Sequence, residues 1–260
     1  MSRYASMFER LHRRGEGAFG AFAMLGDPDL ETSARLLDTL VEAGADMLEV
    51  GIPFSDPVAD GPVIQAAAVR ALSSGVRVAD CFRLLADFRA RYPEVPVGIL
   101  TYANLVVARD RDAFYRAAAD AGVDSVLVAD VPTIEAGPFL ASARAAGIDP
   151  VLIAAPNTPP ETLERIARQG GGYTYCVARA GVTGADEEVR FAGDVIAALK
   201  AADSPPPVLG FGISHPEHVR LALRASAAGV ISGSAIVKLI ERDPAAVAGF
   251  VRSMKAATRL

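Results

Sequence analysis

The chain has 260 residues, 51% hydrophobic and 22% charged, which is enough to bury one large core. Its net charge of -5 and the lack of a basic stripe argue against a nucleic-acid partner. No apolar run reaches the roughly 18 residues that cross a bilayer, and no apolar leader follows the first methionine. Cys81 and Cys176 belong to no spaced cluster and are expected to be buried thiols. We therefore expect a cytoplasmic protein with no membrane partner.

Short apolar segments recur along the chain, and segments with helical period separate them. The apolar segments are rich in Val, Ile, Leu and Ala and do not alternate cleanly with polar residues. Strands that are buried on both faces have this pattern, which predicts a parallel sheet covered by helices. The expected strands are 18–25, 46–51, 97–102, 125–130, 150–154, 173–177, 207–212 and 229–233.

The intervening segments are predicted to be helices. Segments 30–41 and 114–121 carry apolar residues three and four positions apart. Asp27, which precedes a proline, and Ser214, three residues before a glutamate, are expected to cap helices. Segment 6–14 predicts an extra helix ahead of the first strand, which could close the floor of a barrel.

Strands that alternate with helices in this way favour a (β/α)₈ TIM barrel, with residues 1–260 forming a single domain. An open doubly wound sheet is the alternative. Such a sheet usually has fewer strands and a glycine-rich first turn, which Gly26-Asp27-Pro28 does not supply. No linker or low-complexity tract suggests a domain boundary.

Several kinds of chemistry find no support in the sequence. The three lysines, Lys200, Lys238 and Lys255, fall outside the expected strands, so a Schiff base would lack its nucleophile. His215 and His218 fit the start of a helix better than a metal cage. No P-loop and no Gly-x-Ser-x-Gly elbow is present. We expect no metal and no cofactor, which leaves carboxylates and hydroxyls at the strand ends.

Two acids stand out as candidate catalytic groups. Glu49 interrupts an apolar strand and shares the parity of Met47, so we expect it on the barrel interior, where burial would raise its pKa. Asp60 follows the rigid loop 53–60 and precedes the next helix. Acids near the carboxyl end of a barrel strand can transfer protons to and from a substrate. The alternatives are an ion pair for Glu49 and a helix cap for Asp60, while Asp130 is a weaker candidate for ligand contact.

Late in the chain, glycine-bearing turns at 181–184, 210–214 and 232–235 follow the last three expected strands. Backbone N–H groups at such turns bind phosphate well in barrels of this type. Apolar side chains at the strand ends could together line a pocket for an aromatic ring, although each alone is better explained by core packing. They are Phe22, Leu100, Tyr102, Leu127, Ile153, Tyr175 and Phe211.

Together these segments resemble the tryptophan synthase alpha chain family over essentially the whole chain. The most specific match is EVGIPFSDPVADGPVIQ at 49–65. Further matches are LGDP (25–28), YANL (102–105), RAGVTG (179–184), GFGIS (210–214) and SGSA (232–235). Two departures are Ala178, where a serine is common, and Ala68, where an asparagine is frequent.

The resemblance implies a lyase of tryptophan biosynthesis that splits indole-3-glycerol phosphate into indole and glyceraldehyde 3-phosphate. It assigns the acid/base role to Glu49 and contact with the indole N–H to Asp60. The indole pocket it implies consists of Phe22, Leu100, Leu127, Tyr175 and Phe211. With Tyr102, Ile153 and Thr183, these are the residues that we expect to bind the substrate. The phosphate residues it implies are Gly184, Gly212, Gly233 and Ser234.

The resemblance also implies a beta chain that receives the indole in an alpha2beta2 heterotetramer. The residues expected at that interface are Pro53, Asp56, Pro57 and Asn104. Three other functions stay open on the sequence alone. These are a stand-alone indole-releasing lyase, a catalytically silent regulatory barrel subunit, and another phosphosugar barrel enzyme such as an isomerase.

Overall fold

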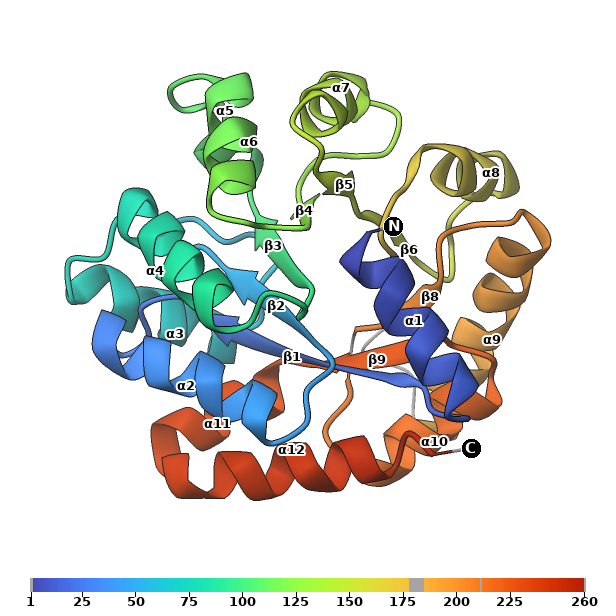
Figure 1. Cartoon of the computed structure of the whole chain (residues 1–260). Helices are drawn as coiled ribbons and strands as arrows, with labels where there is room; N and C mark the ends of the chain where they lie inside the picture. The colour runs from blue at the N-terminus through green and yellow to red at the C-terminus, as the bar shows by residue number, and fades with distance from the viewer. Residues whose placement is uncertain (1, 178–184, 211, 260) are drawn as a thin grey trace.

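The computed structural model describes residues 2–177, 185–210 and 212–259 (Figure 1). Over those residues, nine parallel strands form one sheet in the order β5-β4-β3-β2-β1-β9-β8-β7-β6. The strands are β1 (Ala18–Met24), β2 (Met47–Gly51), β3 (Val97–Thr101), β4 (Ser125–Val128), β5 (Asp149–Pro150), β6 (Leu152–Ala154), β7 (Thr174–Cys176), β8 (Pro207–Leu209) and β9 (Gly229–Ser232).

The sheet curls into a nearly closed barrel. Its two end strands, β5 and β6, are separated in the sequence only by Val151. The Val151 N–H donates to the carbonyl oxygen of Val126 in β4 at 3.1 Å, which joins the two ends. The prediction of a TIM barrel is confirmed, and the fifth expected strand is interrupted at Val151.

Helices surround the barrel (Figure 1). They are α1 (Arg3–Arg13), α2 (Leu30–Glu42), α3 (Pro62–Ser73), α4 (Val78–Arg91), α5 (Ala103–Val107), α6 (Arg111–Asp120), α7 (Gly137–Ala145), α8 (Pro160–Gln169), α9 (Ala185–Ala201), α10 (Pro216–Arg224), α11 (Ser234–Arg242), the 3₁₀ turn η1 (Pro244–Ala246) and α12 (Val247–Ala256). All seven residues of β1 are buried, because one face of the strand lines the barrel and the other packs on helices. Within the described residues, no helix is both long and apolar enough to traverse a bilayer.

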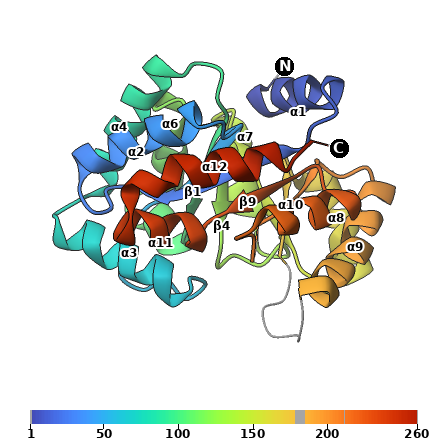
Figure 2. The same cartoon turned by 90° about the horizontal axis from the view of Figure 1, so that it is seen from below.

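The extra helix expected before the first strand is α1, which begins three residues earlier than predicted. It lies at one end of the barrel, outside the ring of helices (Figure 2). Its own residues Tyr4, Met7 and Leu11 are buried against the barrel. The Tyr4 hydroxyl forms a 2.9 Å hydrogen bond with Ser125, the first residue of β4, so α1 covers the end at which the strands begin. The Tyr4 ring also packs on Tyr173, with centroids 5.4 Å apart.

Both predicted helix caps are wrong, and the reasons differ. The cap of α2 is Asp29, whose side chain accepts a backbone N–H of the first turn. Asp27 is instead buried, and its two carboxylate oxygens accept hydrogen bonds from Nε and Nη2 of Arg70 on α3, at 2.7 and 2.8 Å. The cap of α10 is His215, one residue after Ser214, because Pro216 occupies the first helical position.

Candidate active site

Glu49 projects into the barrel from the middle of β2. Its parity partner Met47 packs in the cluster of side chains that fills the barrel, whereas Leu48 and Val50 pack in the layer shared with the helices. The Glu49 side chain is only 2% exposed. The hydroxyl of Tyr173 donates a 2.7 Å hydrogen bond to its Oε1 atom. The structure therefore places a buried carboxyl group inside the barrel, on the face that strand parity predicts.

The environment of Glu49 suits a group that both gives and takes protons. The pKa of Glu49 is raised from 4.5 to about 7, chiefly by burial; the Tyr173 hydrogen bond lowers it, and the nearby charge of Asp60 raises it. With a pKa close to neutrality, the acid and the carboxylate are both populated at neutral pH. That balance is what general acid–base catalysis at neutral pH requires.

Asp60 is half-buried in the loop that joins β2 to α3. The cap of α3 is Gly61, so Asp60 is not a helix cap. Burial raises the pKa of Asp60, and a hydrogen bond with Tyr102 lowers it. The Tyr102 hydroxyl also accepts the Ala59 N–H at 3.3 Å, and its ring stacks on Phe54 with centroids 5.4 Å apart. Tyr102, at the end of β3, thus holds the loop that carries Asp60.

The structure brings most of the expected apolar pocket together. Phe22, Leu127 and Tyr175 are buried in the cluster inside the barrel, and Leu100 and Ile153 pack against it half-buried. The Tyr175 hydroxyl donates to the carbonyl oxygen of Gly210 at 2.7 Å, which ties β7 to the end of β8. The expected site residues that lie outside the described residues are Thr183, Gly184 and Phe211.

Of the turns that are expected to bind phosphate, the two that the structure describes are joined to each other. Gly212 follows β8 with φ of +76°, a left-handed conformation that suits glycine, and it is exposed. Gly233 caps α11, and Ser234 is the first residue of that helix. The hydroxyl of Ser232, at the end of β9, donates to the Ile213 carbonyl oxygen at 2.6 Å. This buried hydrogen bond fixes the Gly212 turn beside the start of α11.

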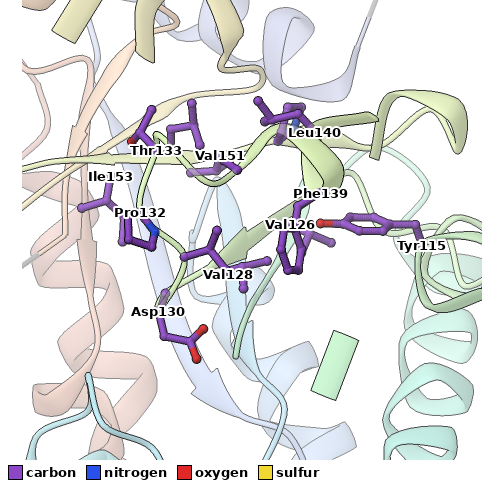
Figure 3. A pocket seen from close by; sticks show the side chains of 15 residues that line it. Tyr115, Val126, Val128, Asp130, Pro132, Thr133, Phe139, Leu140, Val151 and Ile153 are labelled. Carbon is purple, nitrogen blue, oxygen red and sulfur yellow. The ribbon is translucent and has the colours of Figure 1, made fainter. Parts of the chain in front are cut away.

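A separate cavity of about 310 Å³ lies beside β4 and α7 (Figure 3). Its lining does not include either candidate acid, and Ile153 is the residue it shares with the expected apolar pocket. Asp130 lies at its edge, with the carboxylate directed away from the apolar side chains (Figure 3). That carboxylate accepts the Ala103 N–H at 2.8 Å, so Asp130 orders the start of α5.

The two cysteines are buried and free, as the sequence predicts. Burial raises the pKa of Cys81 and of Cys176 to about 12, so neither thiol ionises at neutral pH. Across the described part of the chain, His, Cys, Asp and Glu side chains form no group of three that could hold a metal ion.

Sequence reasoning did not assign a role to Tyr173. The residue precedes β7 and shares the parity of Tyr175, which was expected to face the barrel interior. That parity could have placed the Tyr173 hydroxyl inside as well. Its contact with Glu49 could not be predicted, because 124 residues separate the two.

Replacing Tyr173 with Phe should raise the pKa of Glu49 above its value of about 7. The hydroxyl hydrogen bond stabilises the carboxylate more than the neutral acid, so its loss favours protonation. The measurement is a ¹³C NMR titration of the Glu49 side-chain carboxyl. Tyr92→Phe, which removes an exposed hydroxyl bonded to Glu42, is the matched control. If the Tyr173→Phe titration curve overlays that of the wild type, the hydroxyl does not tune Glu49.

Comparison with known proteins places the chain in a family. A family model described as "Tryptophan synthase alpha chain" matches residues 8–259. The chain belongs to the tryptophan synthase alpha chain family. The family member from Shewanella oneidensis is 54% identical, over 99% of this chain and 95% of its own length. The member from Vibrio vulnificus is 52% identical over the full length of both chains.

Solved structures agree with the family assignment. Tryptophan synthase subunit alpha from Legionella pneumophila matches with a TM-score of 0.90 at 31% identity, over 99% of this chain and 98% of that one. A chain of tryptophan synthase from M. tuberculosis, in its aminoacrylate-bound form, matches with a TM-score of 0.90 at 28% identity over both full lengths. The resemblance read from the sequence motifs is therefore confirmed at the level of the family.

Proposed function

We propose that this chain is the lyase subunit of tryptophan synthase and splits indole-3-glycerol phosphate into indole and glyceraldehyde 3-phosphate. The observation that carries the proposal is the buried Glu49 carboxyl, with its pKa near 7 and Asp60 close by. Membership of the family supports the choice of substrate. The two buried free thiols, Cys81 and Cys176, agree with a reducing cytoplasm.

The reaction needs a proton donor and a proton acceptor. In its acid form, Glu49 gives a proton to C3 of the indole ring, which becomes an electron-poor indolenine. The glycerol hydroxyl next to the ring then loses its proton to the Glu49 carboxylate. The bond between C3 and the side chain breaks, its electron pair returns to the ring, and the side chain leaves as an aldehyde. Asp60 stabilises the positive charge that builds on the ring nitrogen.

The substrate would lie with its ring in the barrel and its phosphate at the mouth. Phe22 and Tyr175 offer apolar surface for the ring inside the barrel. The exposed turn at Gly212 and the start of α11 at Gly233 offer backbone N–H groups to the phosphate. The ring would then be near Glu49, with the phosphate held by the turns after β8 and β9.

We also propose a beta chain as partner, in an alpha2beta2 heterotetramer. Three exposed apolar side chains follow β2, β3 and β4 in turn, at Val58 (81% exposed), Val107 (46%) and Ile134 (65%). Neighbouring strand ends on one face of a barrel form one surface, and exposed apolar side chains on it suit a protein partner. Of the interface residues that the family resemblance implies, Asp56 and Asn104 are exposed, Pro57 is half-buried and Pro53 is buried. Pro53 would therefore act by shaping the loop.

The direct test is to incubate the pure chain with indole-3-glycerol phosphate and assay for indole, with and without a beta chain. Indole should appear, and faster when the partner is present. A chain that releases no indole under either condition would leave the silent regulatory subunit as the better reading. Fast turnover that ignores the partner would favour the stand-alone lyase.

The proposed surface can be tested with Ile134→Asp. A charge placed in a partner interface should raise the beta chain concentration for half-maximal activation about tenfold, while activity of the isolated chain stays unchanged. Val69→Asp is the matched control, because Val69 is 61% exposed on α3 and Ile134 is 65% exposed. Equal activation curves for the two variants would remove Ile134 from the interface.

A further inference from the structure

One side chain beside the Gly212 turn has no role in the reaction proposed above. His218 lies in the first turn of α10, and its Nδ1 atom is 3.0 Å from the Gly212 carbonyl oxygen. The same atom is 3.3 Å from the backbone nitrogen of Ser214. One imidazole nitrogen therefore reaches the backbone on both sides of Ile213.

Either neutral form of the His218 ring makes a hydrogen bond to this turn. With the proton on Nδ1, the ring donates to the Gly212 carbonyl oxygen; with the proton on Nε2, Nδ1 accepts the Ser214 N–H. On the other side, the Ser232 hydroxyl holds the Ile213 carbonyl oxygen. The turn is therefore fixed from α10 and from β9 at adjacent peptide units.

We propose that His218 is a positioning residue that holds the Gly212–Ser214 turn in the conformation that binds the substrate phosphate. The inference rests on the proposed function, because it gives the turn a phosphate ligand. A turn that is already ordered loses less conformational freedom when it binds an anion, which strengthens binding. His218 itself does not contact the phosphate; it acts through the backbone N–H groups of the turn.

A purely structural role for His218 makes a different prediction. As the third residue of α10, its side chain reaches back to the segment before the helix, as a capping residue does. If it only stabilised the helix start, its loss would lower the stability of the chain and would affect binding of ring and phosphate alike. If His218 instead positions the turn, its loss weakens binding of the phosphate and leaves binding of the indole ring unchanged.

The experiment compares His218→Leu, His218→Asn and His215→Leu by titration with inorganic phosphate and, separately, with indole. His218→Leu should weaken phosphate binding about three- to tenfold, the effect of one lost hydrogen bond, and leave the Kd for indole within about twofold. His218→Asn, which keeps a polar atom near the turn, should recover part of the loss. His215→Leu removes a neighbouring exposed imidazole and should change neither Kd. With indole-3-glycerol phosphate as substrate, His218→Leu should raise KM and leave kcat unchanged.

Three outcomes would overturn the proposal: an unchanged Kd for phosphate in His218→Leu, a parallel loss of indole binding, or a wild-type chain that does not bind phosphate. Failure of the proposed function looks different, since the wild type would then bind phosphate but release no indole. In that case the phosphate titrations still decide the role of His218.

Discussion

Glu49→Gln should abolish indole release and leave the chain folded. Glutamine has the same shape, and its amide oxygen can still accept the Tyr173 hydroxyl that bonds Oε1 of Glu49. It cannot give a proton to C3 of the ring or take one from the hydroxyl. Each positioned proton transfer contributes roughly 10²–10⁴ in rate, so kcat should fall by at least about 10³. The measurement is indole formation under saturating substrate, with binding followed separately.

The same variant should change how stability depends on pH. The pKa of Glu49 rises from 4.5 to about 7 in the folded chain, so between those values the native state holds a proton that the unfolded state has lost. Stability therefore falls as pH rises through that window, by up to about 3 kcal/mol. Glu49→Gln should lose this dependence and be the more stable protein at pH 8. The exposed Glu94 supplies the matched control, Glu94→Gln, which should alter neither activity nor the pH profile of unfolding.

Arg70→Met should be the most destabilising of these substitutions. Asp27 is 1% exposed, and both of its carboxylate oxygens bind Arg70. Removing the guanidinium leaves a buried carboxylate without its partner, which costs roughly 3–5 kcal/mol. The measurement is urea unfolding followed by circular dichroism. Because α3 follows the loop that carries Asp60, some loss of activity should accompany the loss of stability.

Two further variants test whether the unpaired buried charge causes the loss of stability in Arg70→Met. Arg168→Met breaks an exposed pair with Glu164 at 3.4 Å and should cost well under 1 kcal/mol. Asp27→Asn combined with Arg70→Met removes the unpaired charge and should recover a large part of the lost stability. A double variant as unstable as Arg70→Met alone would show that lost packing, and not the buried charge, is responsible.

The sequence predicts the barrel well because its signals are local. Apolar runs without alternation predicted strands buried on both faces, and the parity of Met47 placed Glu49 inside. Sequence reasoning also grouped Phe22, Leu127 and Tyr175 as candidate pocket residues, and the structure places all three in the cluster inside the barrel. It missed the break at Val151, because a strand that closes a barrel carries the same apolar signal as any other.

The unpredicted contacts join distant parts of the chain. Asp27 precedes a proline and reads as a helix cap, but its partner Arg70 is 43 residues away. Nothing in the sequence near Glu49 points to Tyr173. Long-range pairs of this kind have no periodic signature to detect. His218 differs, because its partners Ser214 and Gly212 lie only four and six residues away, and the sequence placed it no more closely than at the start of a helix.

The packing of Tyr4 on Tyr173 joins α1 to the residue that bonds Glu49. One of the groups that set the acidity of Glu49 is thus held in place by α1, at the end of the barrel where the strands begin. Loops other than the one that carries Asp60 can therefore diversify without resetting the proton affinity of Glu49. Conversely, a truncation that removes Tyr4 would release one side of the Tyr173 ring and so change the acidity of Glu49, while every group proposed to touch the ligand stays intact.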